Sequence, residues 1–131
     1  MKEIIIDTNF LLVPLQFKVD IFSEFDRICH FNYKLFVFEQ SVNELRNIVE
    51  KQKGKSKKAA QFALRLIKPK NIGILKAEGK SVDEIILRNE RKDVLVATQD
   101  KLLKKKLLEK GVSVIILRQR KYLQLIERKA L

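Results

Sequence analysis

Carboxylates stand at four similar places along the chain, each shortly after a run of apolar residues. Asp7 directly follows an isoleucine run, and Asp100 follows a later β-branched run. Glu44 and Asp83 stand near the starts of amphipathic segments that follow two further runs. Clustered carboxylates repel one another and favour hard divalent cations such as Mg²⁺ and Mn²⁺, which prefer oxygen ligands. Two such ions can position a water molecule, lower its pKa and neutralise the leaving oxygen of a phosphodiester.

Short apolar runs alternate with amphipathic segments, and this alternation predicts the elements that position the acids. Short apolar runs rich in β-branched residues indicate strands, and a 3.6-residue periodicity indicates helices. Strands that are apolar throughout are typical of a parallel sheet covered on both faces. We therefore expect an α/β fold, a three-layer α/β/α arrangement around a five-stranded, mostly parallel sheet. The expected strands are 4–6, 35–38, 72–75, 94–97 and 114–117, and the expected helices are 19–29, 41–49, 57–68, 81–88 and 100–110.

The segments between these elements carry few structural signals. We expect a turn at residues 7–9, a polar loop at 51–56, and a short terminal helix or tail beginning at 122–126. Gly111 is expected to end the helix before it, because glycine suits the left-handed position after a helix. No repeat or linker divides the chain, so we expect one domain over residues 1–131, with 118–131 as a basic C-terminal segment.

The carboxyl ends of parallel strands share one edge, which is where such sheets bind ligands. Each acid also has a structural interpretation: residues 41–44 and 81–84 match the S-x-x-E capping box, and Asp100 could cap a helix. The recurrence of acids at equivalent places favours one shared site that holds one or two Mg²⁺ or Mn²⁺ ions. The expected catalytic residues and metal ligands are Asp7, Glu44, Asp83 and Asp100.

Positive charge is concentrated in two segments of a chain whose net charge is +12. Residues 46–70 hold nine Lys or Arg and one Glu, and residues 101–131 hold ten Lys or Arg and two Glu. Such basic surfaces favour an anionic partner, nucleic acid first, with a solvated surface as the alternative for any single lysine. The candidate RNA-binding residues are Lys51, Lys53, Lys55, Lys57, Lys58, Arg65, Lys104, Lys105, Arg118, Arg120 and Lys121.

Composition excludes several other classes of protein. No apolar run reaches the roughly 18 residues that a membrane span needs, so we expect no membrane partner. The isoleucines at 4–6 run directly into Asp7, which excludes a secretory signal there. One cysteine and one histidine exclude an internal disulfide and a metal site built from Cys or His. We therefore expect an intracellular, cytoplasmic protein.

Four motifs in this order resemble the PIN-domain nuclease family over nearly the whole chain. They are Ile5-Ile6-Asp7-Thr8-Asn9, Glu44-Leu45, Ser81-Val82-Asp83-Glu84-Ile85 and Val96-Ala97-Thr98-Gln99-Asp100. The resemblance implies that the four acids form a metal site and that Asn9 and Thr98 orient the carboxylates. It also implies hydrolysis of RNA to products with a 5′-phosphate and a 3′-hydroxyl, and the dimerisation that is frequent in the family.

Two further stretches resemble the Fcf/Utp-like branch, which processes small-subunit rRNA precursors in archaea and eukaryotes, more than the VapC-type toxins. They are residues 7–12 followed by 19–22, and the ending 116–122. Glu84 departs from the second Asp that is frequent in that branch, and Gln99 departs from Asn. Glu84 also matches a capping role, so we expect it to lie next to the metal ligands without contacting the metal directly.

The leading hypothesis is therefore a metal-dependent, single-strand endoribonuclease that acts on pre-rRNA, in a pre-ribosomal particle. One alternative is a VapC-type toxin ribonuclease with a protein antitoxin. The other is a non-catalytic RNA-binding factor in ribosome assembly, whose acids only cap helices.

Overall fold

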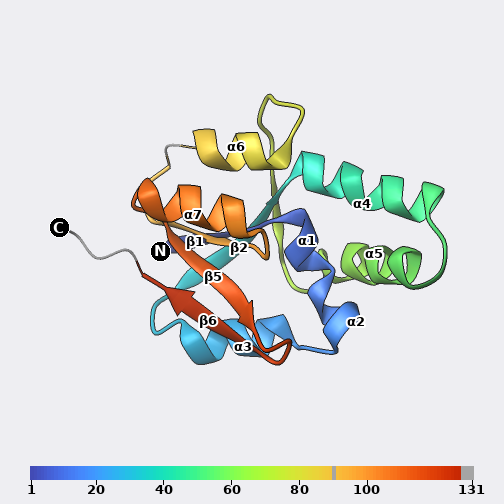
Figure 1. Cartoon of the computed structure of the whole chain (residues 1–131), viewed down its shortest axis with the longest axis horizontal. Coiled ribbons are helices and arrows are strands. Elements are labelled where there is room, and N and C mark those ends of the chain that lie inside the picture. The colour runs from blue at the N-terminus through green and yellow to red at the C-terminus, as the bar shows by residue number, and fades with distance from the viewer. Residues whose placement is uncertain (90, 128–131) are drawn as a thin grey trace.

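The computed structural model describes residues 1–89 and 91–127, with a six-stranded sheet at the centre of the molecule (Figure 1). The strand order is β3-β2-β1-β4-β5-β6, and β1 to β5 are mutually parallel. β6 pairs with β5 in the antiparallel direction. The bounds are β1 Lys2–Ile6, β2 Tyr33–Phe38, β3 Gly73–Leu75, β4 Val94–Ala97, β5 Ser113–Arg118 and β6 Tyr122–Ile126.

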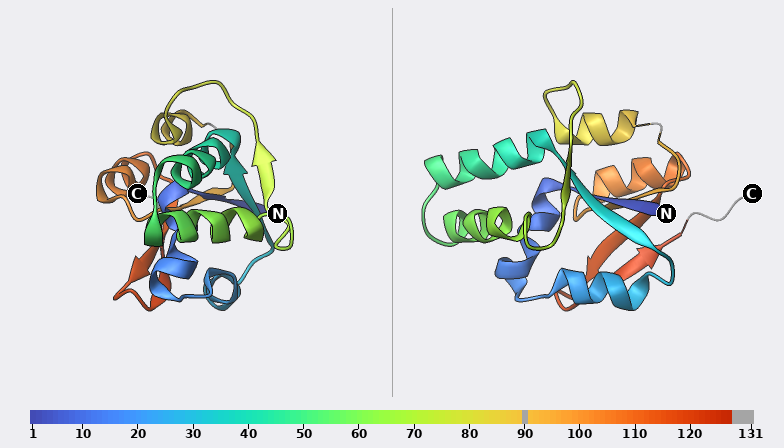
Figure 2. Two further views of the ribbon diagram at one scale, coloured as in Figure 1. Left: turned by 90° about the vertical axis from the view of Figure 1, so that its right-hand side faces the viewer. Right: turned by 180° about the vertical axis from the view of Figure 1, so that it is seen from behind.

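Helices cover both faces of this sheet, as the side and rear views in Figure 2 show. Successive strand residues point to opposite faces. Ile4 and Ile6 of β1 therefore join a core with α1 to α5, while Ile5 joins a second core with α6 and α7. The helix bounds are α1 Thr8–Leu11, α2 Val13–Phe17, α3 Ile21–Ile28, α4 Glu39–Lys51, α5 Gly54–Leu66, α6 Val82–Arg88 and α7 Lys101–Glu109. The predicted three-layer α/β/α fold is confirmed.

β1 lies between β2 and β4 and is buried on both faces, with all three of its isoleucines fully buried. The N–H of Asp7 donates to the carbonyl of Ala97 at 2.9 Å, so the pairing with β4 continues one residue beyond the strand. Asp7 is thereby fixed at the carboxyl edge of the sheet. This is the edge at which α4 follows β2 and α7 follows β4.

The prediction of a terminal helix or tail at 122–126 is wrong, because this segment is the sixth strand. Leu123 is 1% exposed in the core, which anchors the strand. Side chains of α3 bond its free backbone groups: Leu123 N–H donates to Glu24 Oε1, and Leu123 carbonyl accepts from Arg27 Nη2, both at 2.8 Å. An edge strand whose backbone is covered in this way is protected against further strand pairing.

Two connecting segments also differ from expectation. The turn predicted at 7–9 is instead the start of α1, and α2 follows directly with Pro14 in its first turn, a position that proline tolerates. The loop predicted at 51–56 shrinks to Gln52 and Lys53, because α5 already begins at Gly54. Gly111 follows α7 with a φ of 81°, as the sequence predicts. In the described part of the chain, no helix is long and apolar enough to cross a bilayer.

Candidate active site

Asp7 lies at the end of β1 and is the most deeply buried of the four predicted acids, at 3% exposed. Its Oδ1 accepts a hydrogen bond from the backbone N–H of Thr8 at 2.8 Å. Its Oδ2 accepts one from the hydroxyl of Thr98, also at 2.8 Å. Neither donor is charged, so these bonds hold the carboxylate in place without neutralising it.

Thr98 connects Asp7 to Asp100. While its hydroxyl donates to Asp7, the same oxygen accepts a hydrogen bond from the N–H of Asp100 at 3.1 Å. Asp100 is the N-cap of α7, and its Oδ1 accepts from the N–H groups of Leu102 and Leu103 at 2.9 and 3.0 Å. The predicted cap is therefore present, and it occupies one carboxylate oxygen of Asp100.

Asp83 lies in the first turn of α6, where the Ser81 side chain caps the helix by accepting from the Glu84 N–H. The Asp83 side chain is exposed. Desolvation raises its pKa above the usual range, the negative charge of Asp100 raises it further, and Lys106 opposes the shift. Asp83 and Asp100 therefore interact although they belong to different helices.

Glu44 lies one turn further along α4 than predicted. The helix begins at Glu39 with Phe38 as N-cap, so Ser41 is not a cap and the capping box predicted at 41–44 is wrong. Ser41 is fully buried instead, and its Oγ accepts a hydrogen bond from the Thr8 hydroxyl at 2.8 Å. This buried contact joins α4 to α1. Glu44 is exposed and has no capping role.

The electrostatics of Asp7 connect it to two of the other predicted acids. Burial raises the pKa of Asp7 from 3.8 to about 6, and the hydrogen bonds from Thr98 and Thr8 oppose the shift. The negative charges of Asp83 and Glu44 raise the pKa further. Asp7 thus interacts with Asp83 and Glu44, while Asp83 interacts with Asp100. Carboxylates from four separate elements form one electrostatic group.

These oxygens fit a hard divalent cation. The donors are carboxylates, and the centre of the group is a buried acid whose hydrogen bonds, within the described residues, come from the uncharged groups of Thr8 and Thr98. Among residues 1–89 and 91–127, no group of three or more His, Cys, Asp or Glu side chains is placed so that it could hold a metal ion. Mg²⁺ is commonly held by one or two carboxylates and completes its shell with water and substrate phosphate. The fit to such an ion therefore rests on the chemistry of the donors.

The remaining predicted site residues lie around this group with different contacts. Asn9 is exposed in α1, and its backbone carbonyl accepts from the side chain of Gln99 at 3.0 Å. Within the described residues, no hydrogen bond joins the Asn9 side chain to a carboxylate. Glu84 faces Arg88 one helical turn on, at 3.8 Å, with both side chains exposed. The orienting role of Asn9 and the supporting role of Glu84 stay predictions.

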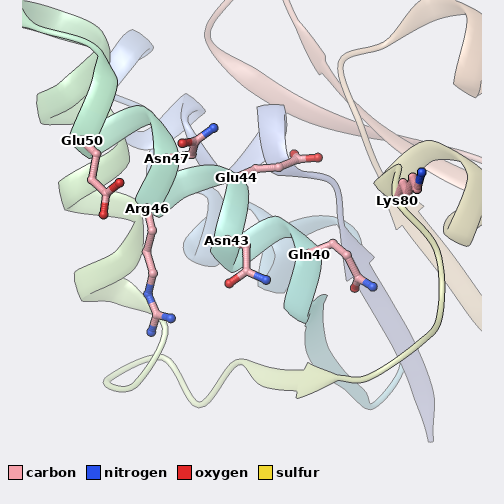
Figure 3. Close-up of a pocket in the computed structure, with 7 residues that line it drawn as sticks. All are labelled: Gln40, Asn43, Glu44, Arg46, Asn47, Glu50 and Lys80. Carbon is pink, nitrogen blue, oxygen red and sulfur yellow. The ribbon is translucent and has the colours of Figure 1, made fainter.

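A hollow of about 430 Å³ opens beside Glu44, and Figure 3 shows Glu44 pointing from α4 toward the loop that carries Lys80. Gln40, which the sequence analysis missed, closes one end of it. Its Nε2 donates to the carbonyls of Ala77 and Gly79 at 2.6 and 3.2 Å, which ties the loop before α6 to α4. Gln40 Oε1 is buried and, among the described residues, has no hydrogen-bond partner. No local pattern distinguishes such a glutamine in a sequence.

The predicted RNA-binding residues occupy three places on the surface. One set follows the end of α4 and continues along α5, one lies on α7, and one lies at the turn between β5 and β6. Lys104 is half-buried, and the others are exposed. In order, the three sets are Lys51, Lys53, Lys55, Lys57, Lys58 and Arg65; Lys104 and Lys105; and Arg118, Arg120 and Lys121.

The architecture and the site together define an α/β protein with an acidic centre at the carboxyl edge of a mostly parallel sheet. The chain belongs to the PIN-like domain family. The family model, described as "PIN like domain", matches residues 4–120. In fold it is similar to the PIN domain endonuclease Utp24, with a TM-score of 0.78 at 24% identity, over 95% of this chain and 91% of that one.

Two curated relatives match this chain over most of its length. Ribonuclease VapC4 of Methanocaldococcus jannaschii is 32% identical over 127 residues, which is 95% of this chain and 97% of the relative. Ribonuclease VapC9 of Archaeoglobus fulgidus is 29% identical over 118 residues, or 89% of this chain and 84% of the relative. Both relatives are named as VapC ribonucleases. The motifs at 7–12, 19–22 and 116–122 instead favour the Fcf/Utp-like branch, and these two relatives do not support that finer prediction.

Proposed function

We propose that this protein is a metal-dependent endoribonuclease. The observation that carries the proposal is the buried carboxylate of Asp7, whose pKa is raised by desolvation and by its neighbours Asp83 and Glu44. A group of acids that destabilise one another, at the ligand-binding edge of a parallel sheet, is arranged for a bound cation rather than for stability. Similarity to two proteins named ribonucleases supports RNA as the substrate.

In this proposal some of the metal-binding carboxylates are held in place by hydrogen bonds, and the others are exposed. Mg²⁺ or Mn²⁺ supplies positive charge for the phosphodiester and lowers the pKa of the attacking water. Asp7 is held by Thr8 and Thr98 and provides a fixed oxygen ligand. Asp100 keeps one oxygen for its helix cap and can present the other. The exposed Glu44 and Asp83 would complete the ligand set, and the basic residues would hold the RNA backbone.

Within ribonucleases, we propose the VapC-type role first. It was the alternative to pre-rRNA processing, and the sequence relatives favour it. If it is correct, expression of the chain arrests growth, and the product of a small neighbouring gene relieves the arrest. Cleavage of a pre-rRNA fragment at a single site without growth arrest would support the processing role instead.

Titration with Mn²⁺, followed by calorimetry, tests the metal site. We compare the wild type with Glu44→Gln and Asp83→Asn, two exposed positions where the change should leave the fold intact. Asp93→Asn is the matched control: it removes an exposed acid at the opposite edge, and asparagine tolerates the φ of 59° there. We expect the two site variants to bind at least about tenfold more weakly than the wild type and the control.

The same proteins are then assayed for cleavage of single-stranded RNA with Mn²⁺. Loss of cleavage in both site variants, with the control unaffected, supports the proposal. If the wild type binds no Mn²⁺ even with RNA present, the acids form no metal site and the non-catalytic RNA-binding factor becomes the better interpretation.

A further inference from the structure

A second hollow lies between α2 and the first turns of α5, and has a volume of about 620 Å³. Its apolar wall is formed by Leu15 and Phe17 of α2 and by Ala59 of α5. Leu15 is 38% exposed, so this wall includes an apolar side chain open to solvent. The volume lies in the range of sites that hold small organic molecules. An exposed apolar wall of this size is suited to a flat, partly apolar group.

The rim of this hollow is positively charged. Lys18 follows α2, while Lys55 and Lys58 stand on α5, and no acidic side chain is among the lining residues. On the α2 side, the guanidinium of Arg120 lies 5.6 Å from the ring centre of Phe17. The turn between β5 and β6 therefore adds a fourth cation beside the hollow. The two basic segments of the sequence, far apart along the chain, meet around α2.

Gln16 connects this hollow to the acidic site. It lines the α2–α5 hollow, and it also lines a smaller hollow of about 240 Å³ together with Asn9, Gln99 and Asp100. A ligand that occupies both hollows would pass the Gln16 amide, which can donate and accept hydrogen bonds. The two hollows together extend from Asp100 to an apolar wall with a positively charged rim.

We propose that the α2–α5 hollow is a nucleotide subsite, which seats one base of single-stranded RNA next to the phosphate that is cleaved. The base lies against Leu15 and Phe17, and the amide of Gln16 contacts its polar edge. Lys55 and Lys58 each bind one of the two adjoining phosphates. Single-stranded RNA is commonly recognised by apolar or aromatic contact with a base and by hydrogen bonds to its edge. This inference rests on the proposed ribonuclease function and adds a source of base preference.

Binding of single-stranded RNA tests the cationic rim. Labelled homopolymers of about 12 nucleotides, one for each base, are titrated by fluorescence anisotropy with EDTA to prevent cleavage. The variant is Lys55→Gln with Lys58→Gln, and the control is Lys34→Gln with Lys92→Gln, which removes two exposed lysines near the opposite edge. The logarithm of the binding constant falls linearly with the logarithm of the salt concentration, and each lost phosphate contact makes this slope less steep by about 0.7. We therefore expect a slope that is less steep by about 1.4, and binding about tenfold weaker at 0.15 M salt.

Sequencing of the products from a randomised single-stranded RNA tests the base contact. We expect the wild type to prefer certain bases at one position beside the cut, and Gln16→Ala to lose that preference at least about fivefold. The subsite is refuted if the wild type cleaves RNA but Gln16→Ala and the Lys55→Gln, Lys58→Gln double variant both behave like the control. An acidic peptide would then be the better candidate for the ligand of this hollow. If the wild type neither binds nor cleaves RNA, the proposed function itself fails.

Discussion

Replacement of Asp7 by asparagine tests the electrostatics of the acidic group through protein stability alone. In the folded protein the pKa of Asp7 is about 6, against 3.8 for a free side chain. Above pH 6 the carboxyl is ionised in both the folded and the unfolded chain, and the folded protein bears the full cost of its burial. A rise of this size corresponds to about 3 kcal/mol of lost stability.

Asparagine has the same shape and removes the charge. Its side-chain oxygen can accept the bond from the Thr8 N–H, and its amide can donate to the Thr98 oxygen, although the Thr98 hydroxyl hydrogen then loses its acceptor and offsets part of the gain. We therefore expect Asp7→Asn, in a metal-free buffer at pH 8, to be more stable than the wild type by up to about 3 kcal/mol. For a chain of this size that is a rise in Tm of about 10 °C.

The pH dependence has a definite sign. As the pH falls from about 6 toward 3.8, the folded wild type takes up a proton on Asp7 before the unfolded chain does. The wild type therefore gains stability relative to the variant over this window, and their difference should be small near pH 4. Urea unfolding followed by circular dichroism at pH 8, 6 and 4, with EDTA, measures the change, and Asp93→Asn serves as the control.

Two results would refute this reasoning. One is a variant that is no more stable than the wild type at pH 8, which would mean that burial of the carboxylate costs little. The other is a stability difference that stays constant from pH 8 to pH 4, which would trace the effect to packing. Mn²⁺ then adds a further comparison: it should stabilise the wild type and leave Asp7→Asn almost unchanged.

Two other substitutions test the parts of the fold that local sequence patterns missed. Leu123→Ala should cost about 2–4 kcal/mol in urea unfolding, because Leu123 is 1% exposed in the core; a flexible C-terminal tail would leave the stability unchanged. Ser41→Ala should cost about 1–2 kcal/mol, because it leaves the buried Thr8 hydroxyl without its acceptor; a Ser41 that merely capped a helix would instead be replaceable by Asp or Asn at no cost.

The strands that carry the site could be predicted because their burial is visible in the sequence. β1, β2 and β4 are short runs of apolar residues, and such runs are typical of parallel strands buried on both faces. β6 gives a weaker signal. It is buried mainly through Leu123, and it lies directly after the charged residues of the β5–β6 turn. Its position depends on contacts with α3, almost a hundred residues away in the sequence.

The S-x-x-E pattern at 41–44 shows why local capping signals can mislead. The same four residues fit a helix that starts at Ser41 and a helix that already runs through it. The extended backbone at Phe38 places the start at Glu39 and directs the Ser41 hydroxyl into the core. Its partner there is Thr8, 33 residues earlier. That contact becomes visible only when α1 and α4 are placed together.

Burial also distinguishes the four acids in a way that their similar positions in the sequence do not. Asp7 is fixed in the interior by uncharged donors, whereas Glu44 and Asp83 remain exposed and free to turn. Burial of the Asp7 charge, with smaller contributions from the charges of Asp83 and Glu44, destabilises the metal-free fold, and a bound cation would offset both costs. The energetic cost of Asp7 and its affinity for a metal therefore have one physical origin. A substitution that removes the charge should make the protein more stable and less active, which is the trade-off expected of a functional site.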